Sequence, residues 1–334
     1  MRRTILAVVL SFLMVTAAWT LLGSGAPVQG GKDKVTLRTN WLWYGSHAIF
    51  FYGVDLGYYD QENIDLDIKQ GNGSGNAVRL VAAKDDTFAY ASASTMMNLA
   101  AQGAPVIAVA SIDAMGTDAC MCRPDSGITK IKDLEGKKVM TTAGAGVNTF
   151  FPVALQNARV DINKIELVYV AENALVSSYL QGLAPCILAG IDDKPAEIEA
   201  QGGATPVIFN YADYGVAQPG YAIVAHKDTV KNNPDLVRRF VRATLKAVDA
   251  AKQDPDAAIN SLINWSANVE DQRQQARKVL DVTLSILISP NNTQKKLGLN
   301  VPKDWESALK LLKQYRDLKT DLPATAFYTN DFIP

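Results

Sequence analysis

Strand-like and helix-like segments alternate along this sequence, and that alternation is what most limits its fold. Between residues 34 and 113, apolar segments with the two-residue period of strands are separated by segments with helical periodicity. The same order starts again at residue 118 and continues to residue 192. This order is typical of parallel sheets covered by helices. One hydrophobic core rarely serves 334 residues, so the sequence predicts two α/β lobes.

The last third of the chain returns to the first lobe. Residues 220–228 form one further strand-like segment, and helical segments follow it to the C-terminus. We therefore predict that lobe 1 is discontinuous, with residues 31–113 and 218–334, and that lobe 2 comprises residues 114–217. Two crossings between lobes make a hinge, and the cleft between lobes is the usual position of a small-molecule site.

The N-terminal segment has the pattern of a secretion signal. Arg2 and Arg3 precede an apolar run over residues 5–22, and small residues follow it. We predict a signal peptide over residues 1–30, cleaved after Ala26 or nearby, and a periplasmic location for the mature protein. An uncleaved membrane anchor is the alternative, because a run of about 18 residues is at the lower limit for a spanning helix.

Charge and composition exclude several classes of partner and cofactor. The 33 Lys and Arg residues nearly balance the 34 Asp and Glu residues, without a basic cluster, so we expect no nucleic-acid partner. Two His and three Cys residues are too few for a zinc cluster of the usual spacing, and we expect neither a metal nor a cofactor. Cys120 or Cys122 could pair with Cys186 in an oxidising compartment. Unpaired, buried cysteines are the interpretation that we favour.

Five segments occur in the order found in a known family. They resemble periplasmic substrate-binding proteins of ABC importers, in the branch that binds thiamine-pyrimidine precursors, alkanesulfonates, taurine and nitrate. The resemblance implies a two-lobed periplasmic-binding-protein (Venus-flytrap, type II) fold with a double-crossover hinge and a helical C-terminal region. It also implies a small-molecule solute and an ABC permease as partners, and we expect a monomer. The segments are LGYYDQENIDLDI, SGITKIKDLEGKKV, AGAGVNTFFPVAL, PAEIEAQGG and FYTNDFIP.

The loop after the first strand is the first candidate site. Trp41 and His47 match positions in the family's pyrimidine-precursor and riboflavin-type branch, whereas Trp43 and Tyr44 replace its Pro-Asn pair. Aromatic walls stack on planar solutes. The resemblance thus implies a planar or anionic organic solute, either pyrimidine-precursor-like or an aromatic acid, in contact with these four residues. Core packing of Trp41 and a capped or solvated His47 are the alternatives.

Three further loops are candidates, because open α/β sheets bind ligands at the carboxyl ends of their strands. The glycine-rich turn over residues 71–76 opens a helix, and it either binds an anionic group or needs glycine for conformation alone. The second loop offers hydroxyl groups for a ligand or as helix caps. The third lies in lobe 2 and would meet the ligand on closure. The predicted contacts are Gly73 and Ser74; Ser92, Ser94 and Thr95; and Thr142, Gly144, Ala145, Gly146 and Asn148.

Charged residues after the strand near residue 190 leave two alternatives for the solute. Asp192, Asp193 and Lys194 stand where the resembled family commonly has an Asn-Glu-Pro-like segment. If Lys194 faces the cleft, an anionic aromatic solute fits. If Lys194 points outward, Asp192 or Asp193 would accept a hydrogen bond from a ring amine.

Catalysis has little support in the sequence. Neither His47 nor His226 belongs to a recognisable nucleophile motif, so we predict a binding protein and not an enzyme. A pyrimidine-synthase-like enzyme on the same scaffold is an alternative, suggested by Cys120 and Cys122, which we expect to face opposite sides of a strand. A ligand-sensing subunit of a receptor is the other alternative.

Overall fold

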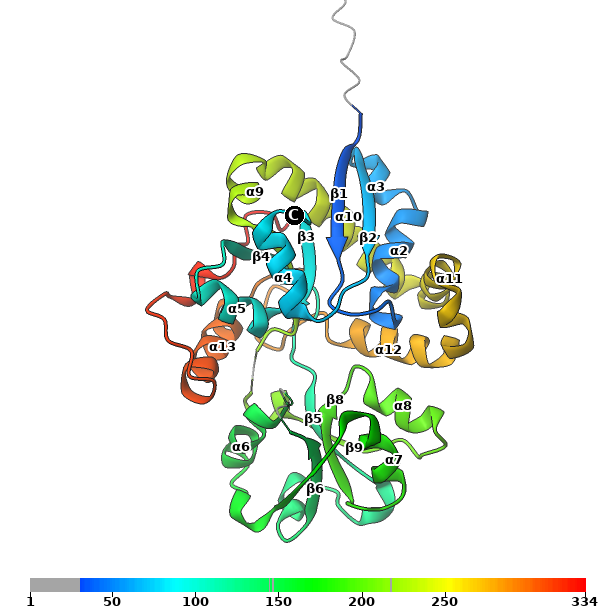
Figure 1. Ribbon diagram of the computed structural model, residues 1–334, viewed down its shortest axis with the longest axis vertical. Helices are drawn as coiled ribbons and strands as arrows, with labels where there is room; N and C mark the ends of the chain where they lie inside the picture. The colour runs from blue at the N-terminus through cyan, green and yellow to red at the C-terminus, as the bar shows by residue number, and fades with distance from the viewer. Residues whose placement is uncertain (1–30, 144, 146, 217) are drawn as a thin grey trace, which may run out of the picture. The chain divides into compact units, whose positions relative to one another are not determined.

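The computed structural model describes residues 31–143, 145, 147–216 and 218–334 (Figure 1). The signal peptide expected over residues 1–30 lies outside the described residues. In the described part of the chain, ten strands form two five-stranded sheets, in the orders β2-β1-β3-β10-β4 and β7-β6-β8-β5-β9. Both sheets belong to one compact unit, Asp33–Pro334. The lobe boundaries near residues 114 and 217 stay a prediction.

The first sheet is formed mainly by the N-terminal part of the chain. Its strands are β1 (Asp33–Arg38), β2 (Ile64–Lys69), β3 (Phe88–Ser92), β4 (Val106–Ser111) and β10 (Tyr221–His226). The helices between these strands are α2 (Ala48–Asp55), α3 (Tyr58–Gln61), α4 (Ser74–Ala83) and α5 (Ala93–Ala101). After β10 come α9 (Lys227–Asn232), α10 (Pro234–Gln253), α11 (Pro255–Trp265), α12 (Arg273–Ser285) and α13 (Pro302–Tyr315).

The second sheet is formed by the middle of the chain. Its strands are β5 (Asp118–Cys122), β6 (Lys138–Thr142), β7 (Glu166–Val170), β8 (Cys186–Gly190) and β9 (Val207–Asn210). The α-helices here are α6 (Val147–Asn157), α7 (Leu175–Leu180) and α8 (Lys194–Ala200). Short 3-10 helices complete the described chain: η1 (Gly45–His47), η2 (Pro124–Ser126), η3 (Ile131–Leu134), η4 (Ile162–Lys164), η5 (Glu172–Ala174), η6 (Tyr211–Tyr214), η7 (Ala267–Gln272) and η8 (Ala324–Ala326).

Both sheets are mixed, whereas the alternation of strands and helices predicts parallel sheets. In the first sheet β10 runs antiparallel to β3 and β4, and in the second β5 runs antiparallel to β8 and β9. These two strands are the first after each crossing between the sheets. Tyr221 at the start of β10 pairs with Ser92 at the end of β3, and Asp118 at the start of β5 pairs with Gly190 at the end of β8. At each crossing the chain enters the sheet at the edge where the neighbouring strands end. The new strand therefore runs antiparallel to those neighbours.

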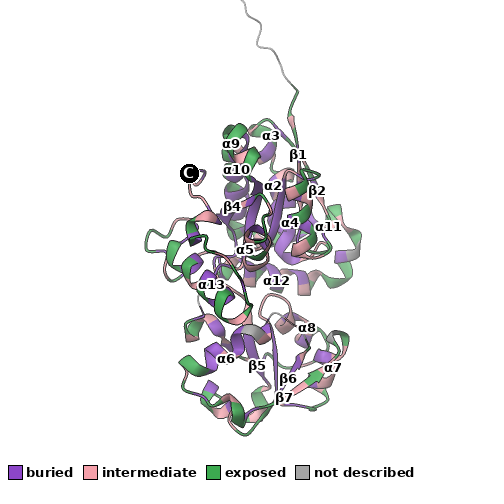
Figure 2. Ribbon diagram, turned by 60° about the vertical axis from the view of Figure 1, so that its left-hand side comes forward, coloured by how far each residue is buried: buried purple, intermediate pink, exposed green. Residues whose placement is uncertain are grey.

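Helices cover both faces of the first sheet, and its strands β3, β4 and β10 are almost wholly buried (Figure 2). On one face the rings of Phe88 and Phe240 stack with centroids 4.0 Å apart, which joins β3 to α10. On the other face, small residues such as Ala89 and Ala91 pack in the cluster that includes α4 and α5. Burial on both faces explains why β3 and β4 are apolar along their length, without alternation. Among the described helices, none has the length and apolar character that a membrane crossing requires.

The cysteines differ from expectation in two respects. Cys122 and Cys186 form a disulfide at directly paired positions of β5 and β8, so the favoured interpretation of unpaired cysteines was wrong for these two. Cys120 is a buried free thiol. The expectation that Cys120 and Cys122 face opposite sides was also wrong, because residues two apart on a strand point to the same face. The three sulfur atoms lie within 4.8 Å of one another.

Candidate functional site

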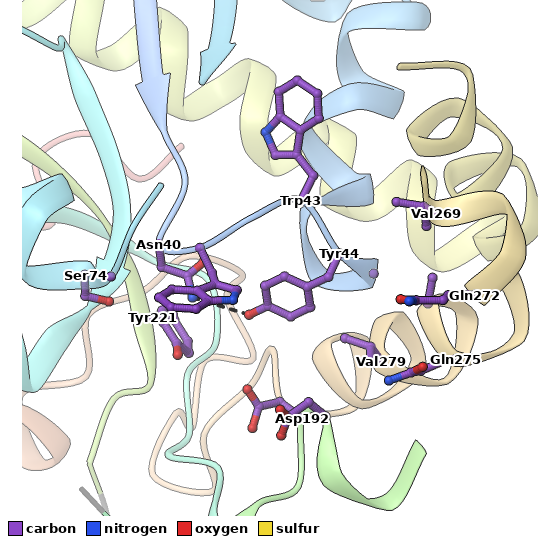
Figure 3. A pocket seen from close by; sticks show the side chains of 15 residues that line it. Asn40, Trp43, Tyr44, Ser74, Asp192, Tyr221, Val269, Gln272, Gln275 and Val279 are labelled. Atoms are coloured by element: carbon purple, nitrogen blue, oxygen red, sulfur yellow. Dashed lines mark hydrogen bonds between the residues drawn. The ribbon is translucent and has the colours of Figure 1, made fainter. Parts of the chain in front are cut away.

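A cavity of about 420 Å³ lies where the loops that follow β1, β2 and β8 meet α12 (Figure 3). Its volume is typical of small-molecule sites. Segments far apart in the sequence contribute to it, including the start of β10 and the segment from η7 to α12. The lining residues are Asn40, Trp41, Trp43, Tyr44, Gly45, Gly73, Ser74, Asp192, Asp193, Tyr221, Val269, Gln272, Gln275, Ala276 and Val279.

Backbone contacts hold the first two loops together. The N-H groups of Gly71 and Gly73 donate to the carbonyl oxygens of Trp41 (3.0 Å) and Asn40 (2.8 Å). A Cβ at Gly71 would lie 1.8 Å from the Thr39 carbonyl oxygen, so the close approach requires glycine there. Gly73 has a φ of 90°, which also favours glycine. The glycine-rich turn therefore serves a conformational need, whether or not it binds an anion.

His47 is a buried neighbour of the cavity and does not line it. Its Nδ1 accepts a hydrogen bond from the Tyr44 backbone N-H (3.3 Å), so the ring proton is on Nε2, which donates to Asn40 Oδ1 at 2.7 Å. Burial lowers the pKa of His47 to about 3, and the ring is neutral. In this position His47 orients the Asn40 side chain, and the ligand contact expected at His47 stays a prediction.

The orientation of Asn40 determines which hydrogen bond Tyr44 can make. With its oxygen bound to His47, Asn40 directs its amide nitrogen to the Tyr44 hydroxyl oxygen, at 3.4 Å (Figure 3). The Tyr44 hydroxyl therefore accepts from Asn40 and keeps its own O-H for donation. Burial raises the pKa of Tyr44, so the phenol stays protonated. The cavity has a hydrogen-bond donor at this point.

Four of the described residues that line the cavity are aromatic, and their rings are placed differently. Trp41 lines the cavity with 51% of its surface exposed. The Trp43 ring turns away from Tyr44 and Asp192 and packs edge-on against Phe51, with centroids 4.9 Å apart (Figure 3). Tyr221, which is not among the contacts expected from the sequence, stacks on Tyr90 with ring centroids 5.1 Å apart. Trp41, Tyr44 and Tyr221 thus supply the aromatic faces that a planar solute could contact.

Asp192 and Asp193 line the cavity, whereas Lys194 does not. Lys194 Nζ lies 3.2 Å from Asp193 Oδ2 and 2.9 Å from Glu197 Oε2. Burial raises the pKa of both aspartates, that of Asp193 to about 6. None of the described lining residues is Lys or Arg. Of the two alternatives for this segment, the arrangement matches the one in which an aspartate accepts from a ring amine.

The other expected contacts lie elsewhere. Ser92, Ser94 and Thr95 line a second cavity, which shares Tyr221 with the first. Thr142, Ala145 and Asn148 line neither of these two cavities as the described residues form them. The Asn148 side chain donates to the Thr142 carbonyl oxygen at 2.8 Å, which is a local contact at the start of α6. Gly144 and Gly146 lie outside the described residues.

Sequence reasoning missed the residues that α12 and its preceding turn bring to the cavity. Val269, Gln272, Gln275, Ala276 and Val279 come from a helical segment more than 200 residues after the first loop. Their spacing of three and four residues marks one face of a helix. That spacing does not say which element the face meets.

Asp113 predicts a specific pH dependence of stability. It is buried, and burial raises its pKa to about 8, against the opposing effect of a hydrogen bond with Tyr90. In the unfolded chain the pKa is about 3.9. Between these values the folded state binds more protons than the unfolded state, so the free energy of unfolding falls as pH rises from about 4 to 8. The side chain in Asp113→Asn is neutral at every pH. The free energy of unfolding of this variant should therefore fall less with rising pH than that of the wild type.

Thermal unfolding of the wild type and Asp113→Asn at pH 5, 6, 7 and 8 checks this. The melting temperature of the variant relative to the wild type should rise steadily with pH. Asp65→Asn, at an exposed position of β2, serves as the control and should show a constant difference. A constant difference for Asp113→Asn as well would contradict the prediction.

This chain is similar to a known protein family and to solved structures. The model of the family described as "NMT1/THI5 like" matches residues 45–258. This chain belongs to the NMT1/THI5 like family. A structural neighbour, a putative periplasmic sulfonate-binding protein SsuA from Methylobacillus flagellatus, has a TM-score of 0.69 at 17% identity, over 91% of this chain and 93% of that one. The expected two-lobed periplasmic-binding-protein fold is confirmed by this likeness.

Three curated relatives of this NMT1/THI5 like protein carry different descriptions. The riboflavin-binding protein RibY of Chloroflexus aurantiacus is 21% identical, over 90% of this chain and 86% of the relative. The formylaminopyrimidine-binding protein of Halalkalibacterium halodurans is 22% identical, over 84% of each. A 4-amino-5-hydroxymethyl-2-methylpyrimidine phosphate synthase of Legionella pneumophila is 21% identical, over 91% and 93%. Two of these three relatives are named as binding proteins.

Proposed function

We propose that this protein is the extracytoplasmic solute receptor of an ABC importer, which binds a planar, amino-substituted ring compound and delivers it to a membrane permease. The aromatic cavity with two carboxylates is the observation that carries the proposal. The likeness to a sulfonate ABC transporter's binding protein supports the permease partner. The signal-like N-terminus, expected from residues 1–30, supports a periplasmic location. We further propose that the protein acts as a monomer.

The hydrogen-bonding groups of the cavity support an amino-substituted nitrogen heterocycle. Such a ring offers a nitrogen acceptor beside an amine donor. The Tyr44 O-H can donate to the ring nitrogen, and the carboxylate of Asp192 or Asp193 can accept from the amine. The name of the formylaminopyrimidine-binding relative supports the same class. A sulfonate or carboxylate solute is disfavoured, because the described lining has two acids and no Lys or Arg.

The enzyme alternative has weaker support. One relative is named as a synthase, which keeps the alternative open to test. However, the described lining contains no His, Cys or Lys, which are common catalytic nucleophiles and bases. Cys120, Cys122 and Cys186 are buried in the second sheet and do not line this cavity. Binding is therefore the function that the geometry supports.

Calorimetric titration of the purified protein tests the proposal. The probes are 4-amino-5-hydroxymethyl-2-methylpyrimidine as the amino-substituted ring, and benzoate and taurine as anions. Mass spectrometry of small molecules released on denaturation, and of the pyrimidine after incubation, runs in parallel. We expect saturable binding of the pyrimidine, unchanged in mass, and none of the anions. Binding of the anions alone would overturn the solute class, and conversion of the pyrimidine would favour the enzyme alternative.

A further inference from the structure

A second cavity, of about 380 Å³, adjoins the first. Tyr221 lines both cavities. Hydrogen-bonded side chains connect the two linings: Thr117 of the second cavity hydrogen-bonds to Asp192 of the first. The Ser74 hydroxyl of the first accepts from the Ser92 backbone N-H of the second at 3.0 Å. Polar groups and the Tyr221 ring therefore lie where the two cavities meet.

The second cavity differs from the first in its chemistry. Hydroxyl and amide groups line it, among them Ser94, Thr95 and Gln218. The Ser94 hydroxyl donates to Gln218 Oε1 at 3.2 Å, which directs the Gln218 amide nitrogen elsewhere as a donor. Among the described residues of this lining, Tyr221 and Phe150 supply the aromatic surface. A flat ring finds less stacking surface here than in the first cavity.

Two opposite charges in the second lining offset each other. Asp118 is half-buried at the start of β5, and Arg316 follows the end of α13. The charge of Arg316 favours the ionised form of Asp118 and opposes the effect of burial. With one acid and one base in the described lining, neither an anionic nor a cationic group is preferred. The lining offers both hydrogen-bond donors and acceptors, from carboxylate, guanidinium, hydroxyl and amide groups. Such a set can bind the adjacent hydroxyl groups of a polyol, each of which donates and accepts.

We propose that the second cavity binds a neutral, polyhydroxylated arm of the solute whose ring lies in the first cavity. The solute is then a two-part molecule, with an amino-substituted ring joined to a sugar-like or polyol chain that passes Tyr221. This inference rests on the proposed function, because the ring site is the one described above. It adds a second recognition element, and it predicts that a bare ring binds more weakly than a ring that carries the arm.

The test uses pairs of probes that share a ring and differ in the arm. Calorimetric titration compares cytosine with cytidine, adenine with adenosine, and lumiflavin with riboflavin. In at least one pair, we expect the arm-bearing member to bind about tenfold more tightly or better, as one or two added hydrogen bonds to charged groups would give. Thr95→Leu, which narrows the second cavity and removes a hydroxyl, should abolish that advantage.

Matched variants separate the two cavities. Gln275→Leu changes the lining of the first cavity. It should raise the Kd of both members of a pair by a similar factor. Thr95→Ser keeps the hydroxyl and should keep the advantage. Thermal unfolding checks that each variant folds, and Thr95→Val, which removes the hydroxyl at nearly the same size, replaces Thr95→Leu if that variant does not.

The outcomes distinguish the two proposals. If the bare ring and the arm-bearing member bind with equal Kd in every pair that binds, the inference is overturned. The proposed function then still stands. The inference is also overturned if Thr95→Leu weakens the binding of both members of a pair by the same factor. If no member of any pair binds, and the pyrimidine of the first experiment does not bind either, the proposed function fails and the two-part solute fails with it.

Discussion

Replacing Asp192 with Asn should weaken the binding of 4-amino-5-hydroxymethyl-2-methylpyrimidine about 100-fold, because a hydrogen bond to a charged group contributes about 1.5 to 3 kcal/mol. Asp192 lines the cavity, and Asn retains its shape and a hydrogen-bond acceptor for Thr117. The substitution therefore removes the charge with little change in packing. Calorimetric titration of both proteins at pH 7.5 gives the ratio of Kd values directly.

Asp65→Asn is the matched control for this experiment. It removes one carboxylate from an exposed position near the start of β2, and its Kd should equal that of the wild type. Comparing the two variants separates a local charge effect at the cavity from a change in the protein's net charge. An Asp192→Asn protein that binds the pyrimidine as tightly as the wild type would contradict the assignment of Asp192 as the amine's acceptor.

Replacing Gly45 with Ala should lower the free energy of unfolding by about 3 kcal/mol, in the upper range for overpacking. A Cβ at Gly45 would lie 1.9 Å from the Ala276 backbone oxygen and 2.9 Å from the Val279 Cβ. Both are parts of α12 that cannot turn aside as a flexible side chain would. Either the first loop or α12 must move, and since both line the cavity, binding should also be lost. Urea denaturation and the titration described above measure the two effects.

Gly75→Ala is the control for the substitution at Gly45. Gly75 is in the first turn of α4, where a Cβ would meet only the Arg79 side chain at an ordinary 3.6 Å. Alanine is the better helix former, so this variant should be as stable as the wild type or slightly more stable. If Gly45→Ala unfolds at the same urea concentration as Gly75→Ala, then the contact between the first loop and α12 is not a tight one in solution.

The element order of the fold was predictable because strand and helix periods are local properties. Two-residue and 3.6-residue periods can be read from neighbouring side chains, and both sheets contain the strands that these periods predicted. The direction of β5 and β10 was not predictable in this way. It depends on where the chain enters each sheet, which is a property of the crossings and not of the strands.

The candidate site was predictable only in part, for the same reason. Trp41, Tyr44 and Asp192 line the cavity because they follow directly on strands whose carboxyl ends meet. His47 follows a strand as well, yet it turns inward, because Asn40 and the Tyr44 backbone offer it two hydrogen bonds in the buried interior. No local pattern distinguishes an inward from an outward side chain in a loop.

By itself, the sequence determined the class of fold, the family and the loops from which a site would be built. These depend on periodicity and on motifs, which survive in the order of the residues. Only the tertiary structure decided that α12 closes one wall of the cavity, that Lys194 pairs with acids while Asp192 and Asp193 line it, and that Cys122 bonds to Cys186. Each of these joins segments that lie apart in the sequence or selects one rotamer among several. Packing of the whole chain determines such choices, because the energies that separate them come from contacts between distant residues.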